Sequence, residues 1–150
     1  RLPGERAIGH VRYSTSGAST VKNAQPFAVG FSGSSMAISH NGNLTNSTEL
    51  LEHVYKSDLR HVNTDSDSEI LLNVFAHELQ LQGKLQPEPA DVFAAVARVH
   101  RRCRGAYAVV GMIANYGLFA FRDPHGIRPL IFGKRRTYSG FFLSAMCRKS

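Results

Sequence analysis

The chain contains no tryptophan and only two cysteines, Cys103 and Cys147, among its 150 residues. The two cysteines are far apart, and neither has another cysteine or a histidine at the spacing of a zinc site. Disulfide frameworks use more cysteines and belong to oxidising compartments. We therefore expect two buried or free thiols, no metal ion bound by these residues, and a cytoplasmic location.

Long apolar runs are also missing. No stretch approaches the roughly 20 residues that a helix needs to cross a bilayer, and the first residues lack the apolar core of a signal peptide. Hydrophobic residues make up 43% of the chain and charged residues 19%, as in one ordinary globular domain. We expect no contact with a membrane. Because the chain begins with Arg1 rather than Met, we expect it to be part of a longer protein.

Acidic residues are scarce toward the C-terminus. Residues 98–150 hold eleven Lys and Arg but one acid, Asp123, whereas residues 1–97 hold seven basic and ten acidic residues. A basic segment can bind nucleic acid, so a nucleic acid-binding module is one alternative. The segment does not interleave aromatic residues with its charges, as stacking on bases would require. Its arginines at 98, 101 and 102 fall on an expected helix, where we expect a solvated face or a contact with further sequence, and no nucleic acid partner.

The apolar patterns predict strands, then helices, then strands. Alternation with a period of two predicts strands, and apolar residues three and four apart predict helices that begin at capping residues. The expected strands are 7–13, 27–31, 36–40, 106–114, 117–122, 129–133 and 138–143, and the expected helices are about 50–57, 70–83 and 90–103. This order indicates a layered α+β protein without repeats or linkers.

Two polar clusters stand near the ends of the first expected strands. The guanidinium group of Arg12 could bind a carboxylate, although a surface ion pair would also explain it. Asn41 and Gly42 could together donate hydrogen bonds to a developing oxyanion, one through a side-chain amide and the other through a backbone N–H that glycine leaves accessible. A plain Asn-Gly turn is the alternative for this pair.

A third cluster, Asp65, Asp67 and Glu69, opens the second expected helix. Helix capping and the helix dipole explain acids there, but one of them could instead bind an ammonium group. The three clusters together would suit an α-amino acid whose side-chain amide is attacked. Farther along, Asp123 and Arg128 lie among proline and glycine residues that predict a tight turn, where we expect a structural ion pair or a turn-holding role.

Six motifs occur in the order in which class II glutamine amidotransferases have them. They are GHVRYST at 9–15, NAQPF at 23–27, HNGNL at 40–44, DSDSE at 65–69, RGAY at 104–107 and RDPHGIRPL at 122–130. The sequence resembles this superfamily over residues 5–136, and within it resembles the amidophosphoribosyltransferase family. Glucosamine-6-phosphate synthase typically has Arg-Trp in place of Arg12 and Tyr13, and asparagine synthetase departs in the earlier motifs.

The resemblance implies the four-layer αββα fold of the N-terminal-nucleophile (Ntn) hydrolases, an α+β fold, here incomplete at its N-terminus. It implies that residues 1–150 are a partial type 2 glutamine amidotransferase domain and that the phosphoribosyltransferase domain is absent. The nucleophile of the family is an N-terminal cysteine, which this chain lacks, so we expect the isolated chain to be inactive. Residues 143–150 depart from the family, and we assign them no function.

The same resemblance gives roles to the site residues. Arg12 would bind the α-carboxylate of glutamine, and Asp67 its α-ammonium group. The side chain of Asn41 and the backbone N–H of Gly42 would form the oxyanion hole. Tyr13 would lie on a loop that responds to the second substrate. None of the scattered histidines is expected to be a general base or a metal ligand.

The full-length enzyme implied by this resemblance releases ammonia from glutamine and uses it with phosphoribosyl pyrophosphate to make phosphoribosylamine, the first committed step of de novo purine biosynthesis. We expect no cofactor in this chain, magnesium in the absent phosphoribosyltransferase domain, and a homo-oligomeric full-length enzyme. The alternatives are the glutaminase domain of another class II amidotransferase, such as glucosamine-6-phosphate synthase, and a noncatalytic binding domain on the same scaffold.

Overall fold

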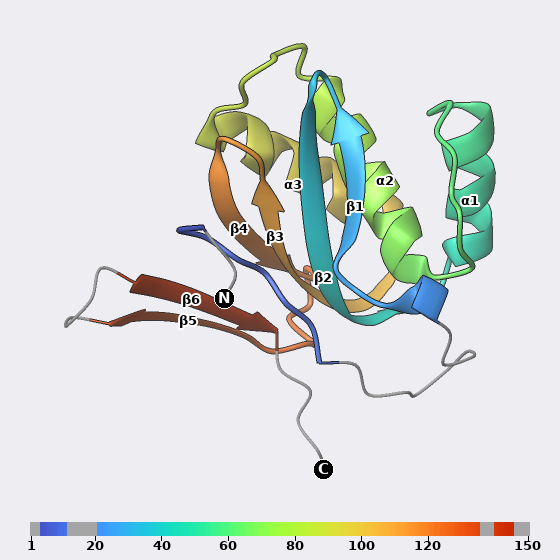
Figure 1. Cartoon of the computed structure of the whole chain (residues 1–150). Coiled ribbons are helices and arrows are strands. Elements are labelled where there is room, and N and C mark those ends of the chain that lie inside the picture. The colour runs from blue at the N-terminus through green and yellow to red at the C-terminus, as the bar shows by residue number, and fades with distance from the viewer. Residues whose placement is uncertain (1–3, 12–20, 136–139, 146–150) are drawn as a thin grey trace.

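The computed structural model describes residues 4–11, 21–135 and 140–145. Its elements in chain order are η1 (Val21–Asn23), β1 (Phe27–Phe31), β2 (Ser34–Leu44), α1 (Ser47–Lys56), α2 (Asp67–Gln80), α3 (Pro89–Arg102), β3 (Gly105–Ile113), β4 (Gly117–Arg122), β5 (Leu130–Arg135) and β6 (Gly140–Ala145). A block of three helices thus separates two sets of strands, and the expected α+β order is confirmed (Figure 1).

The expected strand at 27–31 is confirmed as β1, but the expected strands at 7–13 and 36–40 differ from the structure. Residues 7–11 form no strand, and residues 12–13 lie outside the described residues. Conversely, β2 continues to Leu44 rather than ending at His40. It does so because it stays paired with β3 from Met36 to Leu44, and cross-strand pairing overrides the low strand propensity of Asn and Gly.

The four strands β1 to β4 form one antiparallel sheet in chain order. β1 pairs with β2 only as far as Phe27, opposite Ile38, whereas β3 accompanies β2 to Leu44. Among the described residues, the end of β2 therefore has a strand on one side only. This half-open edge is the part of the fold that positions the candidate site.

All three helices lie on one face of this sheet, with α2 between α1 and α3 (Figure 1). α2 is buried nearly all round because the sheet covers one side and its neighbouring helices cover others. Phe75 of α2 packs against Phe119 and Phe121 of β4, with ring centroids 5.0 and 5.6 Å apart. Burying one such side chain contributes about 2 to 3 kcal/mol, so this contact fixes α2 on the sheet.

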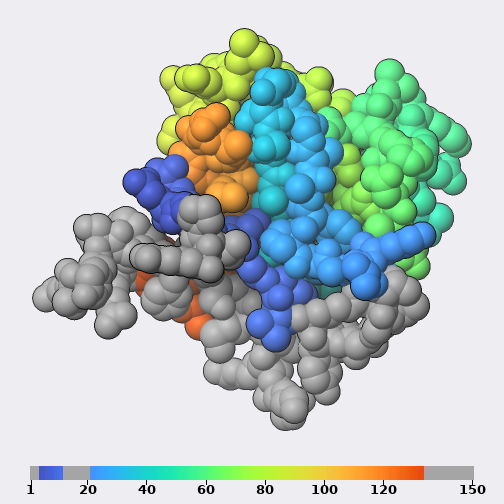
Figure 2. Space-filling view, viewed as in Figure 1, coloured from blue at the N-terminus to red at the C-terminus, as the bar shows by residue number. Residues whose placement is uncertain are grey.

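The opposite face of the sheet is seen in the space-filling view (Figure 2). β1 and β2 form its centre, flanked by α1 and by the tip of the β3–β4 hairpin. Residues 4–11, in dark blue, lie across this face, and there the hydroxyl of Ser39 donates to the carbonyl of Gly9 at 3.3 Å. None of the helices in the described part of the chain is long and apolar enough to span a membrane.

A second, two-stranded sheet of β5 and β6 lies beside β3 and β4, away from the helices (Figure 1). The chain reaches it through a turn built on Asp123, whose buried carboxylate accepts backbone N–H bonds from Tyr107, His125, Ile127 and Arg128. Burial alone would raise the pKa of Asp123, but these four donors outweigh it and hold the pKa below its usual value. The turn-holding role is confirmed, and Arg128 takes part in it through its backbone.

Of the three arginines of α3 expected on a solvated face, Arg101 is exposed as predicted, but Arg98 and Arg102 bind acids of the protein. Arg102 is bound to Asp58 at 2.7 Å and to Glu78 at 2.8 Å, and Arg98 lies 3.6 Å from Glu78. Asp58 and Glu78 are almost completely buried, so they need these cationic partners. Much of the charge on this helix therefore neutralises buried acids of the protein itself.

Replacing Asp123 by alanine should leave four buried or partly buried N–H groups without an acceptor. We expect Asp123→Ala to lower the free energy of unfolding by about 3 kcal/mol. Glu52→Ala is the control, because Glu52 is exposed and makes one surface ion pair with Lys56; it should change stability by less than about 0.5 kcal/mol. Urea unfolding measures both, and equal effects of the two variants would contradict the assignment.

Candidate functional site

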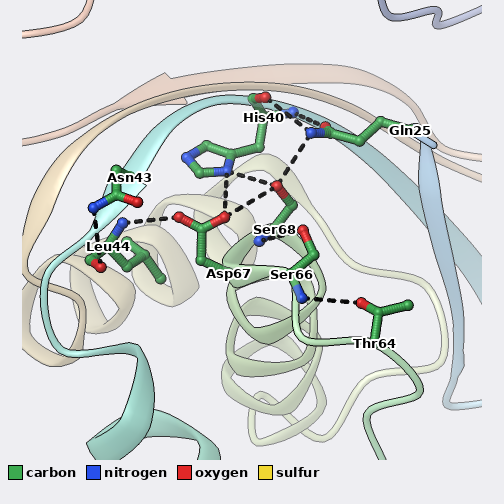
Figure 3. A network of polar contacts seen from close by, with 8 residues as sticks. All are labelled: Gln25, His40, Asn43, Leu44, Thr64, Ser66, Asp67 and Ser68. Carbon is green, nitrogen blue, oxygen red and sulfur yellow. Dashed lines mark hydrogen bonds and ion pairs between the residues drawn. The ribbon is translucent and has the colours of Figure 1, made fainter. Parts of the chain in front are cut away.

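The open edge of β2 is capped at two points by side chains from other elements. The backbone N–H of His40 donates to Oε1 of Gln25 at 2.6 Å, and the backbone N–H of Leu44 donates to Oδ2 of Asp67 at 2.9 Å (Figure 3). Both N–H groups point away from β3. Side chains thus replace a neighbouring strand at residues 40 and 44.

Gly42 lies between these two capped positions. Successive N–H groups of a strand point to opposite sides, and the N–H of Thr45 points to the β3 side, where it donates to the carbonyl of Arg104. The N–H of Gly42 therefore points to the same open edge as those of His40 and Leu44. Neither β1 nor a described side chain takes it up, so it is a donor available to a ligand.

The position of Gly42 requires glycine. Its φ is +154°, and a Cβ there would lie 2.0 Å from the carbonyl oxygen of Ala106 on β3. Gly42 pairs with Tyr107 within the β2–β3 ladder. The alternative of an Asn-Gly turn is therefore wrong: the glycine lets two strands approach closely beside an open edge.

The side chain of Asn41 lies on the face of the sheet opposite to that of its neighbour His40, because successive side chains of a strand point to opposite faces. Its Nδ2 atom is buried and has no hydrogen-bond partner among the described residues. A buried donor without an acceptor costs about 1 to 3 kcal/mol, and such groups are rare in folded proteins. An oxygen atom of a bound ligand would satisfy it.

Asp67 is the first residue of α2 and is not used for capping. The cap is Ser66, whose hydroxyl accepts from the N–H of Ser68 at 3.3 Å. The Asp67 carboxylate turns toward β2, where Oδ2 binds the N–H of Leu44 and Oδ1 lies 3.5 Å from the Ser68 hydroxyl (Figure 3). Its side chain is 21% exposed, so acceptor positions remain for a ligand.

The other two acids of the cluster have different partners. Glu69 is buried and accepts four hydrogen bonds from Asn63 and Thr64, which fasten the loop before α2. Burial acts to raise its pKa, but these donors outweigh it and lower the pKa. Asp65 is exposed and accepts from Asn23 at 3.4 Å. Of the three acids, only Asp67 is directed at the edge of β2.

His40 is buried beneath this edge, with its Nδ1 atom 2.8 Å from the hydroxyl of Ser68. Burial lowers the pKa of His40 to about 4; Asp67 opposes the shift, while His10 and Arg128 add to it. The ring is therefore neutral near pH 7. A neutral ring can bind Ser68 while costing far less to bury than an imidazolium.

The structure thus brings together three of the five site residues that the sequence predicts. Asn41 and Gly42 lie on β2, and Asp67 is bound to that strand two residues farther on, at Leu44. Arg12 and Tyr13 lie outside the described residues, so their roles remain predictions.

Sequence reasoning missed Gln25, His40 and Ser68 as members of the site. Each belongs to one of the motifs quoted above, but no motif shows that their side chains meet. The contacts become visible only when β2 and the start of α2 are placed together (Figure 3).

The described residues offer no clear place for a metal ion. No group of three or more His, Cys, Asp or Glu side chains within them is arranged to hold one.

The buried neutral His40 should make stability depend on pH. The pKa of His40 is lower in the folded chain than in the unfolded chain. Its contribution to the free energy of unfolding is therefore complete above about pH 6.5 and is lost as the pH falls toward 4. The free energy of unfolding falls by at most about 1.4 kcal/mol per pH unit in this range. His40→Gln should lower stability at pH 7 and remove this part of the slope. Urea unfolding between pH 4.5 and 7.5 measures it, and parallel curves for the two proteins would contradict a buried neutral ring.

With this geometry established, comparisons with known proteins give the family. A family model described as "Glutamine amidotransferase domain" matches residues 10–148. The amidophosphoribosyltransferase of Pseudomonas aeruginosa is 58% identical over 140 residues, which are 93% of this chain and 28% of that protein. The Escherichia coli enzyme of the same name is 53% identical over 135 residues, 90% of this chain and 26% of that protein. The chain thus spans about a quarter of the length of these curated relatives.

Solved structures agree with this match. Glutamine phosphoribosylpyrophosphate amidotransferase from B. subtilis, complexed with ADP and GMP, superposes with a TM-score of 0.61 at 29% identity, covering 85% of this chain and 25% of that chain. A structure titled as the allosteric regulatory enzyme of purine biosynthesis gives 0.62 at 31% identity, covering 83% and 25%. These likenesses confirm the expected α+β Ntn fold. Because the family match runs over nearly the whole chain, this protein belongs to the glutamine amidotransferase domain family.

Proposed function

We propose that this chain binds glutamine and activates its side-chain amide, as the glutaminase part of an amidophosphoribosyltransferase. The observation that carries the proposal is the open edge of β2, where a free backbone donor at Gly42, an unsatisfied buried donor on Asn41 and the carboxylate of Asp67 occur together. Two donors and one anion suit an amide and an ammonium group of the same small molecule.

The two donors would act on the amide oxygen. When a thiolate attacks the amide carbon, the carbonyl oxygen becomes an oxyanion, and donors already in place stabilise it more than they stabilise the neutral amide. The N–H of Gly42 is held by the β2–β3 ladder and needs no rearrangement. The Nδ2 of Asn41 gains the partner that it lacks. Collapse of the oxyanion then breaks the C–N bond, and the nitrogen leaves as ammonia after taking up a proton from the α-amino group of the nucleophilic cysteine. Water then hydrolyses the remaining thioester to glutamate.

Asp67 would hold the α-ammonium group at the other end of the molecule. Its carboxylate is bound to Leu44, and N–H groups two residues apart on a strand are separated by about 6.8 Å. In glutamine, four bonds of about 1.5 Å separate the ammonium nitrogen from the amide carbon. The spacing along β2 therefore suits glutamine lying along the strand. Arg12 is proposed to bind the α-carboxylate, and Tyr13 to lie on a loop that responds to the second substrate.

The attacking thiolate is not that of Cys103. This residue is 3% exposed, and burial raises the pKa of its thiol to about 12, so it stays protonated and out of reach of substrate. Cys147 lies outside the described residues and outside the six motifs. In the proposal, the nucleophile is the N-terminal cysteine of the family, which is not among residues 1–150.

In the complete enzyme that we propose, ammonia reacts with phosphoribosyl pyrophosphate to give phosphoribosylamine and pyrophosphate, at the start of purine biosynthesis. That step, with its magnesium ion, belongs to a phosphoribosyltransferase domain that is not part of this chain. This proposal is supported by the curated relatives, which share the name amidophosphoribosyltransferase. Their shared name favours this enzyme over glucosamine-6-phosphate synthase. We also propose that the complete enzyme is a cytoplasmic homo-oligomer and that it has no nucleic acid partner.

Asn41→Ala should separate activity from stability. In the complete protein we expect glutamine-dependent activity to fall about 10²- to 10³-fold, because one oxyanion donor is lost. The free energy of unfolding should not fall and should rise by up to about 1 kcal/mol, because Nδ2 has no partner to lose and its burial is unfavourable. Asn43→Ala is the matched control: it removes an exposed amide two residues away, whose Nδ2 donates to the carbonyl of its neighbour Leu44. Similar rates for the two variants would refute the role of Asn41.

Asp67→Asn keeps an acceptor for the Leu44 N–H but removes the charge, so we expect the KM for glutamine to rise about 10- to 100-fold. Arg12→Ala should act in the same direction. Activity with ammonia in place of glutamine should persist in both, because that reaction bypasses the site. Asp65→Asn, in the same acidic cluster but exposed, is the control. Equal loss of both activities in Asp67→Asn would rule out its proposed role.

A further inference from the structure

We propose that Gln25 is a positioning residue of this site: its side-chain amide ends the pairing of β1 with β2 and thereby keeps the Gly42 N–H open to substrate. The inference rests on the proposed function, because it concerns the donor that would act on the amide of glutamine. Gln25 itself need not touch substrate.

The register of the sheet shows what the side chain replaces. β1 pairs with β2 with Phe27 opposite Ile38. If the ladder continued, the backbone of Gln25 would stand opposite His40 and would exchange two hydrogen bonds with it. Instead, the side-chain amide does so: Oε1 accepts from the N–H of His40 at 2.6 Å and Nε2 donates to its carbonyl at 3.2 Å. A primary amide carries the same donor and acceptor as a peptide group, so the substitution satisfies both groups.

The next step of the same register would close the site. Two residues farther along, Asn23 would stand opposite Gly42 and its carbonyl would accept the Gly42 N–H. In the structure Asn23 is turned away into η1, and its side chain donates to Asp65 in the loop before α2. Because Gln25 reaches His40 with its side chain, the backbone before it lies farther from β2, and Gly42 is left uncovered.

Gln25 also fixes α2 relative to β2. Its Nε2 atom donates to the hydroxyl of Ser68 at 3.1 Å, and the same hydroxyl meets Nδ1 of His40 at 2.8 Å (Figure 3). Ser68 is next to Asp67, the proposed ammonium partner, and lies 3.5 Å from its carboxylate. One amide group thus links the strand that holds the oxyanion donors to the helix that holds the anion.

This linkage predicts a specific functional effect. Effective catalysis requires the ammonium and oxyanion partners to be held at a fixed separation, and an error of about 1 Å can cost about 100-fold in rate. Losing the Gln25 amide removes three hydrogen bonds that maintain the separation between β2 and α2. The expected loss is in kcat with glutamine, because the oxyanion donors act mainly in the transition state.

The test compares Gln25→Met, Gln25→Glu and a control, Gln80→Met, in the complete protein. Gln80 is an exposed glutamine at the end of α2 whose side chain accepts from Arg60. We expect Gln25→Met to lower kcat with glutamine about 10- to 100-fold while KM changes less and ammonia-dependent activity stays at the wild-type level. Gln80→Met should leave all three unchanged. Retained ammonia-dependent activity shows that the variant is folded.

Gln25→Glu adds a pH readout that a general loss of packing would not produce. An ionised carboxylate can accept from the His40 N–H but would repel the His40 carbonyl and Asp67, whereas the protonated form can donate. His40 stays neutral over this range because burial lowers its pKa to about 4, and Asp67, His10 and Arg128 are the titratable and charged groups that act on it. Glutamine-dependent activity relative to wild type should therefore recover as the pH falls from 7.5 to 5.5. The glutamine-dependent activity of Gln25→Met relative to wild type should not change with pH over the same range.

The outcomes separate this inference from the proposed function. Wild-type kcat with glutamine in Gln25→Met, an equal loss of ammonia-dependent activity, or the absence of recovery in Gln25→Glu would overturn the positioning role. If Asn41→Ala and Asp67→Asn lose glutamine-dependent activity while Gln25→Met does not, only the inference about Gln25 fails. If none of the three variants affects that activity, the proposed site itself is wrong.

Discussion

The structure of the site depends on where the pairing between β1 and β2 ends. β2 is paired with β3 from Met36 to Leu44, but β1 pairs with it no farther than Ile38. An unpaired strand edge offers backbone donors to any partner, and proteins usually cover it. Here the Gln25 amide and the Asp67 carboxylate cover two positions and leave the one between them, Gly42, open. A sheet edge is thereby converted into a binding surface.

The remaining features of the molecule support this edge. Helix α2 is buried against the sheet through Phe75 and its neighbours, which fixes the position of Asp67 at its N-terminus. Glu69 anchors the loop before that helix, and buried His40 fills the space between strand and helix as a neutral ring. These stabilising contacts surround the Gly42 N–H, which no described group accepts, and the unsatisfied amide of Asn41, and folding alone explains neither group.

The sequence predicted much of this and failed at identifiable places. Apolar periodicity located the three helices and most strands because those elements bury regular stripes. It ended β2 at His40, because asparagine and glycine disfavour strands and only a long-range partner, β3, overrides that preference. Of the residues that the motifs named, Asn41 and Gly42 lie on β2, and Asp67 is bound to that strand at Leu44. The motifs could not indicate that Gln25 and Ser68 meet, because that contact depends on the register of β1 and on where α2 begins.

The most direct test of the account is a structure of the complete protein with glutamine, or an unreactive glutamine analogue, bound. The account predicts the amide oxygen about 3 Å from both the Gly42 nitrogen and Nδ2 of Asn41, and the ammonium group beside the Asp67 carboxylate. Gln25 should still hold the backbone of His40. A ligand bound away from the edge of β2, or an edge covered by another strand, would contradict the account.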